Sequence, residues 1–95
     1  MSGYLVFEIE VTDAAAYETY RKVAGPIMAR AGGKFLVKSG RIVSLEGGWR
    51  PPSLFVVEFP SFEQARTFYY SKEYQETLDL RAASSKARGI LVEGL

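Results

Sequence analysis

The sequence predicts an α+β fold in which a four-stranded antiparallel sheet carries helices on one face, and three observations lead to it. Residues 4–11 alternate between apolar and polar side chains, which is typical of a strand with one buried face. Residues 54–59 form a run of β-branched and aromatic side chains of the length that strands favour. In residues 14–31 and 62–82 apolar side chains recur at helical spacing, so helices alternate with strands along the chain.

The first helix has recognisable start and stop signals. Asp13 is expected to cap its N-terminus, because an aspartate side chain accepts a hydrogen bond from a free backbone N–H there. Gly32-Gly33 is expected to end it. Pro26 lies inside the pattern and lacks the N–H of a normal helical residue, so we predict a kink at Gly25-Pro26.

Two short strand pieces are predicted next, Lys34–Val37 and Ile42–Leu45, on either side of Ser39-Gly40. The Ser-Gly pair fits a two-residue hairpin turn, or it is a bulge in one long bent strand. We favour the bulge, because hairpin arms of four residues would be marginally stable. Residues 47–52 are rich in Gly and Pro and are predicted to form a loop.

The second half of the chain begins with the strand Leu54–Phe59, which ends at a proline. Ser61 and Gln64 have the spacing of a capping box, so a helix is expected to start there. Ser71 is expected to cap a further helical segment after a break. Ile90–Val92 is predicted as a short last strand.

The predicted order is strand, helix, strand, strand, paired helices, strand. Two split β-α-β units with right-handed crossovers give the ferredoxin-like arrangement, with the first strand and the Leu54 strand at its centre. If the aromatic side chains of these two strands face the helices, the open face carries Val6, Leu54 and Val56. That face is too apolar to leave in water, so we predict a homodimer through the open sheet face.

The amino-acid composition limits which partners and which kinds of chemistry are expected. Ninety-five residues, 47% of them hydrophobic, predict a single folded domain over residues 1–95. A net charge of +1 gives no reason to expect nucleic acid or an anionic membrane as partner. With no Cys and no His, thiol chemistry and the commonest metal ligand are absent, and we expect no metal and no cofactor. No targeting segment and no apolar run near about 18 residues is present, so a cytoplasmic location is expected.

Two candidate functional sites have little support from the sequence. The topology is shared with the RNA recognition motif, but Leu54 and Val56 occupy the positions where that motif stacks aromatic rings on bases. The second candidate consists of Glu8, Glu10 and Glu58 on the open face, where burial would raise a carboxylate pKa toward that of a general base. We favour the alternative that they pair with Arg across a dimer interface or reach solvent.

The favoured candidate site is a set of aromatic and basic side chains between the helices and the sheet. Tyr and Trp combine apolar area with one polar group, and Arg binds a carboxylate through two hydrogen bonds. Such a set suits a small apolar or aromatic acid, and the alternative is that each Tyr simply belongs to the helix–sheet core. The predicted ligand-binding residues, with the Trp-Arg pair as a rim, are Tyr20, Trp49, Arg50, Tyr70, Tyr74 and Arg81.

Several segments resemble, in order, those of a known family. They are Asp13 with Tyr17 and Tyr20, Gly32–Val37, Leu45–Gly47 with Trp49, Glu58–Phe62, Tyr70-Ser71 with Tyr74, and Leu91–Gly94. Over nearly its whole length the chain resembles the domain-of-unknown-function family 1330 (DUF1330). One departure is Ala14, where many members open the helix with Asp-Pro.

The resemblance implies the dimeric α/β-barrel superfamily, in which two ferredoxin-like subunits pack sheet against sheet. That superfamily holds cofactor-free monooxygenases, muconolactone isomerases and heme enzymes, while this family has no established activity. Heme is disfavoured because the usual axial His is absent. Two classes of function stay open: a cofactor-free oxygenase or isomerase acting on an activated aromatic or enolisable substrate, and a non-catalytic dimer that binds a metabolite or a partner protein.

Overall fold

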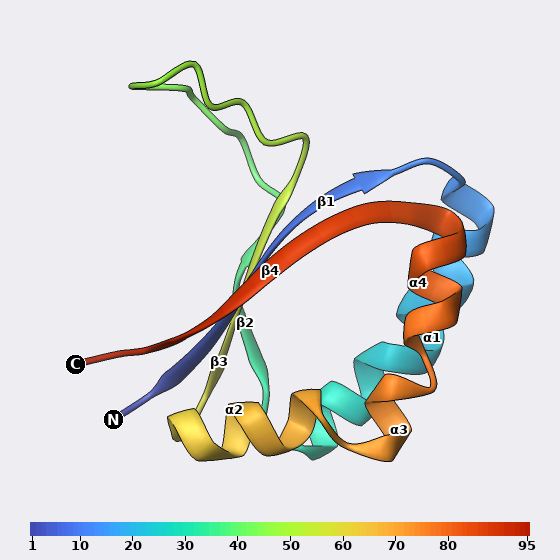
Figure 1. Ribbon diagram of the computed structural model, residues 1–95, viewed down its shortest axis with the longest axis vertical. Coiled ribbons are helices and arrows are strands. Elements are labelled where there is room, and N and C mark those ends of the chain that lie inside the picture. Colours follow the sequence, from blue (N-terminus) through green and yellow to red (C-terminus); the bar gives the residue numbers. More distant parts are fainter.

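The computed structural model describes residues 1–95 and contains one four-stranded antiparallel sheet with helices over one of its faces (Figure 1). The strand order is β2-β3-β1-β4, so the first and third strands are central, as the ferredoxin-like prediction requires. The elements are β1 (Gly3–Val11), α1 (Ala14–Arg30), β2 (Lys34–Lys38), β3 (Leu54–Phe59), α2 (Phe62–Tyr69), α3 (Lys72–Gln75), α4 (Leu78–Ser84) and β4 (Ser85–Glu93).

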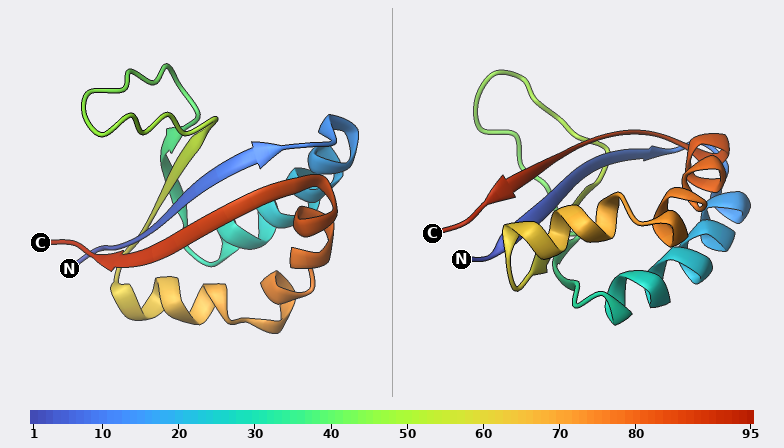
Figure 2. Two further views of the ribbon diagram at one scale, coloured as in Figure 1. Left: turned by 45° about the horizontal axis from the view of Figure 1, so that its top comes forward. Right: turned by 60° about the horizontal axis from the view of Figure 1, so that its bottom comes forward.

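The register of the two central strands decides which side chains face the helices. Leu5 lies opposite Val57 in the β1–β3 pair, and both side chains are almost completely buried, with exposed fractions of 2% and 1%. Val6 lies opposite Val56, on the other face. Because successive side chains of a strand alternate between faces, the predicted division into a helix-covered face and an open face is confirmed. Figure 2 shows the helices together on one side of the sheet.

Side-chain caps start the helices at three predicted positions. Asp13 Oδ1 accepts a hydrogen bond from the backbone N–H of Ala16 at 3.1 Å, and Ser71 Oγ accepts one from that of Tyr74 at 3.3 Å. Ser61 Oγ accepts one from the N–H of Gln64 at 3.0 Å. The second half of the predicted capping box does not form, because the Gln64 side chain accepts from the Ser61 hydroxyl instead.

The helices depart from the prediction in one respect. α1 is a single helix from Ala14 to Arg30 with Pro26 inside it, and the kink at Gly25-Pro26 stays a prediction. The segment after Ser71, however, was predicted as one helix and forms two, α3 and α4. They are separated near Thr77, whose buried hydroxyl donates to the carbonyl oxygen of Tyr74 at 2.6 Å. A local hydrogen bond of this kind competes with regular helix.

The segment around Ser39-Gly40 is neither a hairpin turn nor a bulged long strand. Residues 39–53 form a loop that extends away from the sheet (Figures 1 and 2), and the predicted strand Ile42–Leu45 does not form. Val43 and Leu45 are 78% and 88% exposed, because no neighbouring strand is present to pair with them. The bulge lies earlier, within β2, between Phe35 and Val37.

The last strand is longer than predicted. β4 runs over Ser85–Glu93 and pairs with β1 from Gly3↔Glu93 to Val11↔Ser85, whereas the apolar run alone predicted only Ile90–Val92. The added residues are polar or small, and it is their backbone groups that complete the edge of the sheet beside β1.

Candidate functional site

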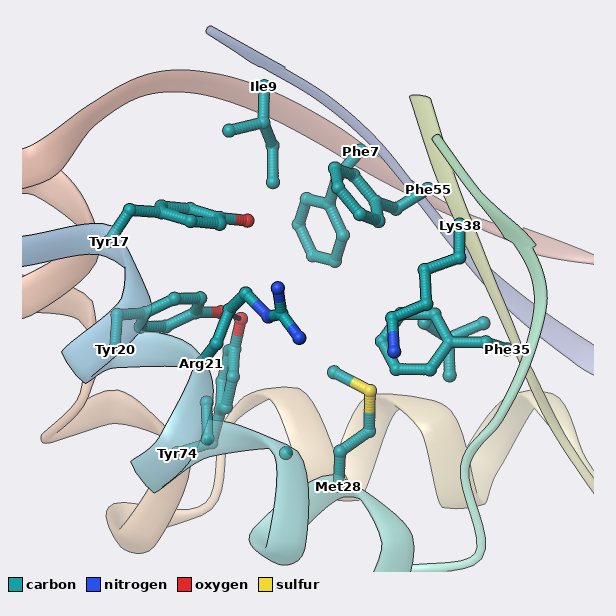
Figure 3. Close-up of a pocket in the computed structure, with 13 residues that line it drawn as sticks. Phe7, Ile9, Tyr17, Tyr20, Arg21, Met28, Phe35, Lys38, Phe55 and Tyr74 are labelled. Atoms are coloured by element: carbon teal, nitrogen blue, oxygen red, sulfur yellow. Dashed lines mark hydrogen bonds between the residues drawn. The ribbon is translucent and has the colours of Figure 1, made fainter. Parts of the chain in front are cut away.

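A cavity of about 220 Å³ lies between α1 and the helix-covered face of the sheet (Figure 3). Most of its lining is apolar, so the cavity suits an apolar or aromatic molecule better than a highly polar one. α1 supplies one helical face, β1, β2 and β3 supply the floor, and α3 closes one side. The lining residues are Phe7, Ile9, Tyr17, Tyr20, Arg21, Ala24, Gly25, Met28, Phe35, Lys38, Phe55, Val57 and Tyr74.

The bulge in β2 is what brings Lys38 to this cavity. Phe35 and Lys38 are three residues apart, so in a regular strand they would point to opposite faces of the sheet. Here Phe35 pairs with Val57 and Lys38 pairs with Phe55, and the register shift between Phe35 and Val37 places both on the helix-covered face. One extra residue therefore adds a cation to an otherwise aromatic edge of the cavity.

Two of the three cavity tyrosines are joined in a polar cluster. Tyr20 Oη and Tyr74 Oη lie 2.9 Å apart and share a hydrogen bond, and Arg81 Nη1 donates to Tyr74 Oη at 3.1 Å. Tyr74 is completely buried, and burial, followed by the neighbouring Tyr20, raises the pKa of its hydroxyl well above the usual range. Arg81 also lies over the ring of Phe7, 5.0 Å from its centroid. These hydroxyls are satisfied within the protein.

The third tyrosine is different. Tyr17 enters the cavity from the start of α1, and Figure 3 shows its hydroxyl oxygen pointing into the space between Ile9 and the phenylalanine rings. Its ring lies 5.4 Å from that of Tyr20, but its hydroxyl makes no hydrogen bond to the protein. Burial raises the pKa of Tyr17, with a smaller contribution from Tyr20, so the hydroxyl stays protonated at neutral pH.

Two cationic side chains complete the lining. Arg21 lies one helical turn after Tyr17, and its guanidinium is 3.3 Å from Glu18 in a half-exposed pair. Lys38 Nζ lies 5.1 Å from the centroid of the Phe35 ring. No Asp or Glu lines the cavity, so its charge is positive on balance.

The chain is similar to known proteins in two ways, by membership of a sequence family and by the fold of solved structures. The family described as "Domain of unknown function (DUF1330)" matches residues 2–95. The chain belongs to the DUF1330 family. No curated protein matches the sequence. The family resemblance noted in the sequence is therefore confirmed, and it brings no assigned activity.

Solved structures share the fold of this DUF1330 chain at low sequence identity. A protein of unknown function from Rhodopseudomonas palustris is 23% identical with a TM-score of 0.76, and the match covers 99% of this chain and 82% of that one. The cofactor-independent oxygenase SnoaB from Streptomyces nogalater is 15% identical with a TM-score of 0.64, covering 99% and 93%. A dimeric protein of unknown function and ferredoxin-like fold from Bacteroides fragilis is 10% identical with a TM-score of 0.65, covering 98% and 96%.

The six residues predicted as one ligand-binding set lie in different parts of the structure. Tyr20 and Tyr74 line the cavity, whereas Arg81 reaches it only through its bond to Tyr74. Arg81 and the 69% exposed Tyr70 line a second depression, of about 330 Å³, between α2, α4 and β4. Trp49 and Arg50 belong to the loop 39–53 and line neither of these spaces.

Sequence reasoning missed Arg21 and Lys38. The spacing of Tyr17 and Arg21 on one face of a helix was a usable signal for the first. The position of Lys38 depends on a bulge that no residue type in Lys34–Lys38 predicts.

No helix of this DUF1330 chain has the length and apolar character that crossing a bilayer requires.

The open-face carboxylates do not form a general-base site. Glu8 accepts hydrogen bonds from Arg88 and, at 3.0 Å, from the indole N–H of Trp49. The Arg88 bond, and then the Trp49 bond, hold the pKa of Glu8 below its ordinary value, which opposes proton abstraction near neutrality. Glu58 accepts from the hydroxyl of Tyr4 at 3.1 Å, and Glu10 is exposed. The Arg partner of Glu8 lies in the same chain, not across an interface.

Proposed function

We propose that this protein binds a small aromatic or apolar acid in the cavity between α1 and the sheet. One observation carries the proposal: an apolar wall is combined with two cations, Arg21 and Lys38, and with no carboxylate. A carboxylate on the ligand supplies the missing negative charge. Glu18 competes for Arg21, but an exposed pair of this kind contributes only about 0–1 kcal/mol and is readily exchanged.

The volume limits the size of the ligand. An apolar cavity of about 150 Å³ holds benzene, and drug-sized ligands fill about 300–1,000 Å³. The cavity of about 220 Å³ lies between these limits. A single substituted ring fits it, and a larger ligand would extend out of its open side.

Isothermal titration calorimetry with benzoate and phenylacetate, against the neutral benzamide, tests the charge requirement. We expect the acids to bind more tightly than the amide. Arg21→Gln and Lys38→Gln should each weaken benzoate binding by up to about fivefold, the range for exposed ion pairs. Lys22→Gln is the matched control, because Lys22 is exposed on α1 but does not line the cavity. Equal affinity for benzoate and benzamide would refute the proposal.

A space-filling variant tests the location. A Cβ added at Gly25 would have no neighbouring atom within 4 Å, so a leucine side chain there has room to occupy the cavity. Replacing glycine favours the helix by about 1 kcal/mol, and a side chain before Pro26 opposes it, so the fold is expected to be retained. Gly25→Leu should abolish benzoate binding while its circular dichroism spectrum matches that of the parent. Unchanged binding would place the site elsewhere.

The likeness to the oxygenase SnoaB favours a second candidate function, oxidation of a bound activated phenol by molecular oxygen without a cofactor. Oxygen uptake in the presence of hydroquinone, above the rate without protein and lost in Gly25→Leu, would support it. An unchanged uptake rate would leave the chain a non-catalytic binding or interaction module.

We further propose that two copies pair through the open sheet face. Val6, Leu54 and Val56 are half-buried there, and Val37, Ile90 and Val92 are exposed. The Bacteroides fragilis protein of this fold is described as dimeric. Sedimentation at micromolar concentration tests the pairing, and a monomer would count against it.

A further inference from the structure

The hydroxyl of Tyr17 faces the cavity, where water reaches it, and it has no hydrogen-bond partner in the protein. Tyr17 is only 8% exposed, and no hydrogen bond of the chain involves its Oη, whereas Tyr20 and Tyr74 satisfy each other. A ligand that fills the cavity displaces this water, and a hydroxyl then left buried without a hydrogen bond costs about 1–3 kcal/mol. The group is therefore expected to find its partner in whatever fills the cavity.

The surroundings offer no alternative partner. The hydroxyl points toward Ile9, Phe7 and Phe55, which carry no polar side-chain atoms (Figure 3). At Phe7 the backbone of β1 is paired with β3 at Phe55 and with β4 at Gly89, so the sheet uses its polar groups there. Only an atom inside the cavity can complete the hydrogen bond.

Tyr17 and Lys38 enter the cavity from opposite sides. Tyr17 comes from α1 and Lys38 from β2, with Arg21 drawn between them in Figure 3. A ring whose carboxylate meets Lys38 and Arg21 would direct its far end toward Tyr17. Lys38 and Tyr17 then mark the two ends of the site, and apart from Arg21 most of the side chains between them are aromatic or aliphatic.

We propose that Tyr17 is a specificity residue, and that the ligand is an aromatic acid with a hydroxyl group on the side of the ring opposite its carboxylate. This inference rests on the proposed function and adds a second requirement to it. A tyrosine hydroxyl both donates and accepts, so it pairs well with a phenolic hydroxyl. A methyl group in the same place would leave Tyr17 unpaired.

The test compares 4-hydroxybenzoate with 4-methylbenzoate, which has a substituent of similar size and no hydrogen bond. Titration calorimetry of the parent should show about a tenfold preference for the hydroxy acid, the value expected for one buried hydroxyl left without its partner. Tyr17→Phe should bind the two acids with affinities within about twofold of each other. Tyr69→Phe is the matched control and should keep the preference, because Tyr69 does not line this cavity.

The possible outcomes distinguish the role of Tyr17 from the proposed binding of an acid. If the parent binds both acids equally, or if Tyr17→Phe keeps the preference, the role of Tyr17 is refuted while acid binding stands. If neither acid binds the parent, both proposals fail. Should Tyr17→Phe not fold, Tyr17→Met replaces it, because Met keeps the apolar bulk without a hydroxyl and should also bind the two acids within about twofold of each other.

Discussion

Removing the hydroxyl of Tyr74 tests whether the buried polar cluster stabilises the fold. The ring of Tyr74 stays in place in Tyr74→Phe, because it packs on Phe68 with centroids 4.5 Å apart. The variant loses the bond shared with Tyr20 at 2.9 Å and the one from Arg81 at 3.1 Å. A neutral hydrogen bond contributes about 1 kcal/mol and one from a charged donor somewhat more, reduced here because Arg81 is only half-buried. We expect a loss of about 2 kcal/mol in the free energy of unfolding.

Urea denaturation at one fixed protein concentration measures this loss, and a thermal melt should fall by about 10 °C for a chain of this size. Tyr69→Phe is the control: Tyr69 is half-buried beside Tyr74, its hydroxyl makes no hydrogen bond, and we expect a change below about 0.5 kcal/mol. A double-mutant cycle with Arg81→Met isolates the Arg81–Tyr74 contribution. If Tyr74→Phe and Tyr69→Phe are equally stable, the cluster is not a stabilising network and the reasoning fails.

Three further outcomes are expected. Ser61→Ala should lose about 1 kcal/mol in denaturant melts through loss of the α2 cap, and unchanged stability would mean that the cap is replaced by water. Val56→Lys should dissociate the proposed dimer in sedimentation, whereas Val43→Lys, in an exposed loop, should not; a dimer in both would exclude the open face. Because the pKa of Glu8 is lower in the folded chain than its ordinary 4.5, its pairing stabilises the fold above that pH and is lost as the pH falls through the lowered value. Emission of Trp49, the single tryptophan, should report this transition in the parent and not in Glu8→Gln.

Local sequence signals predicted most of the fold. The strand Leu54–Phe59 has the predicted ends, because its β-branched run and the following proline act within a few residues. The caps Asp13, Ser61 and Ser71 were predicted for the same reason, since a side chain two or three residues before the N–H that it binds needs no distant partner. By contrast, Ile42–Leu45 has suitable residues and no strand beside it, so it stays a loop.

The candidate site was predictable only in part, because it depends on how distant elements meet. Helical spacing put Tyr17 and Tyr20 on one stripe, but it could not show that only one of them would find a hydroxyl partner, which lies on α3. Trp49 looked like a rim residue from the composition of its loop. Its indole instead donates to Glu8 on the open face, because the loop leaves the sheet on that side.

The loop between β2 and β3 leaves the sheet and returns to it at one place. Lys38 pairs with Phe55, and the N–H of Ser39 donates to the carbonyl of Leu54 at 2.9 Å, so the two ends of residues 39–53 are held together whatever lies between them. Closing a longer or shorter connection changes the free energy only with the logarithm of its length, about 1 kcal/mol between the present loop and a four-residue turn. The chain can therefore accept an insertion or a fused domain here, away from the cavity, with the Trp49–Glu8 contact as the main interaction lost.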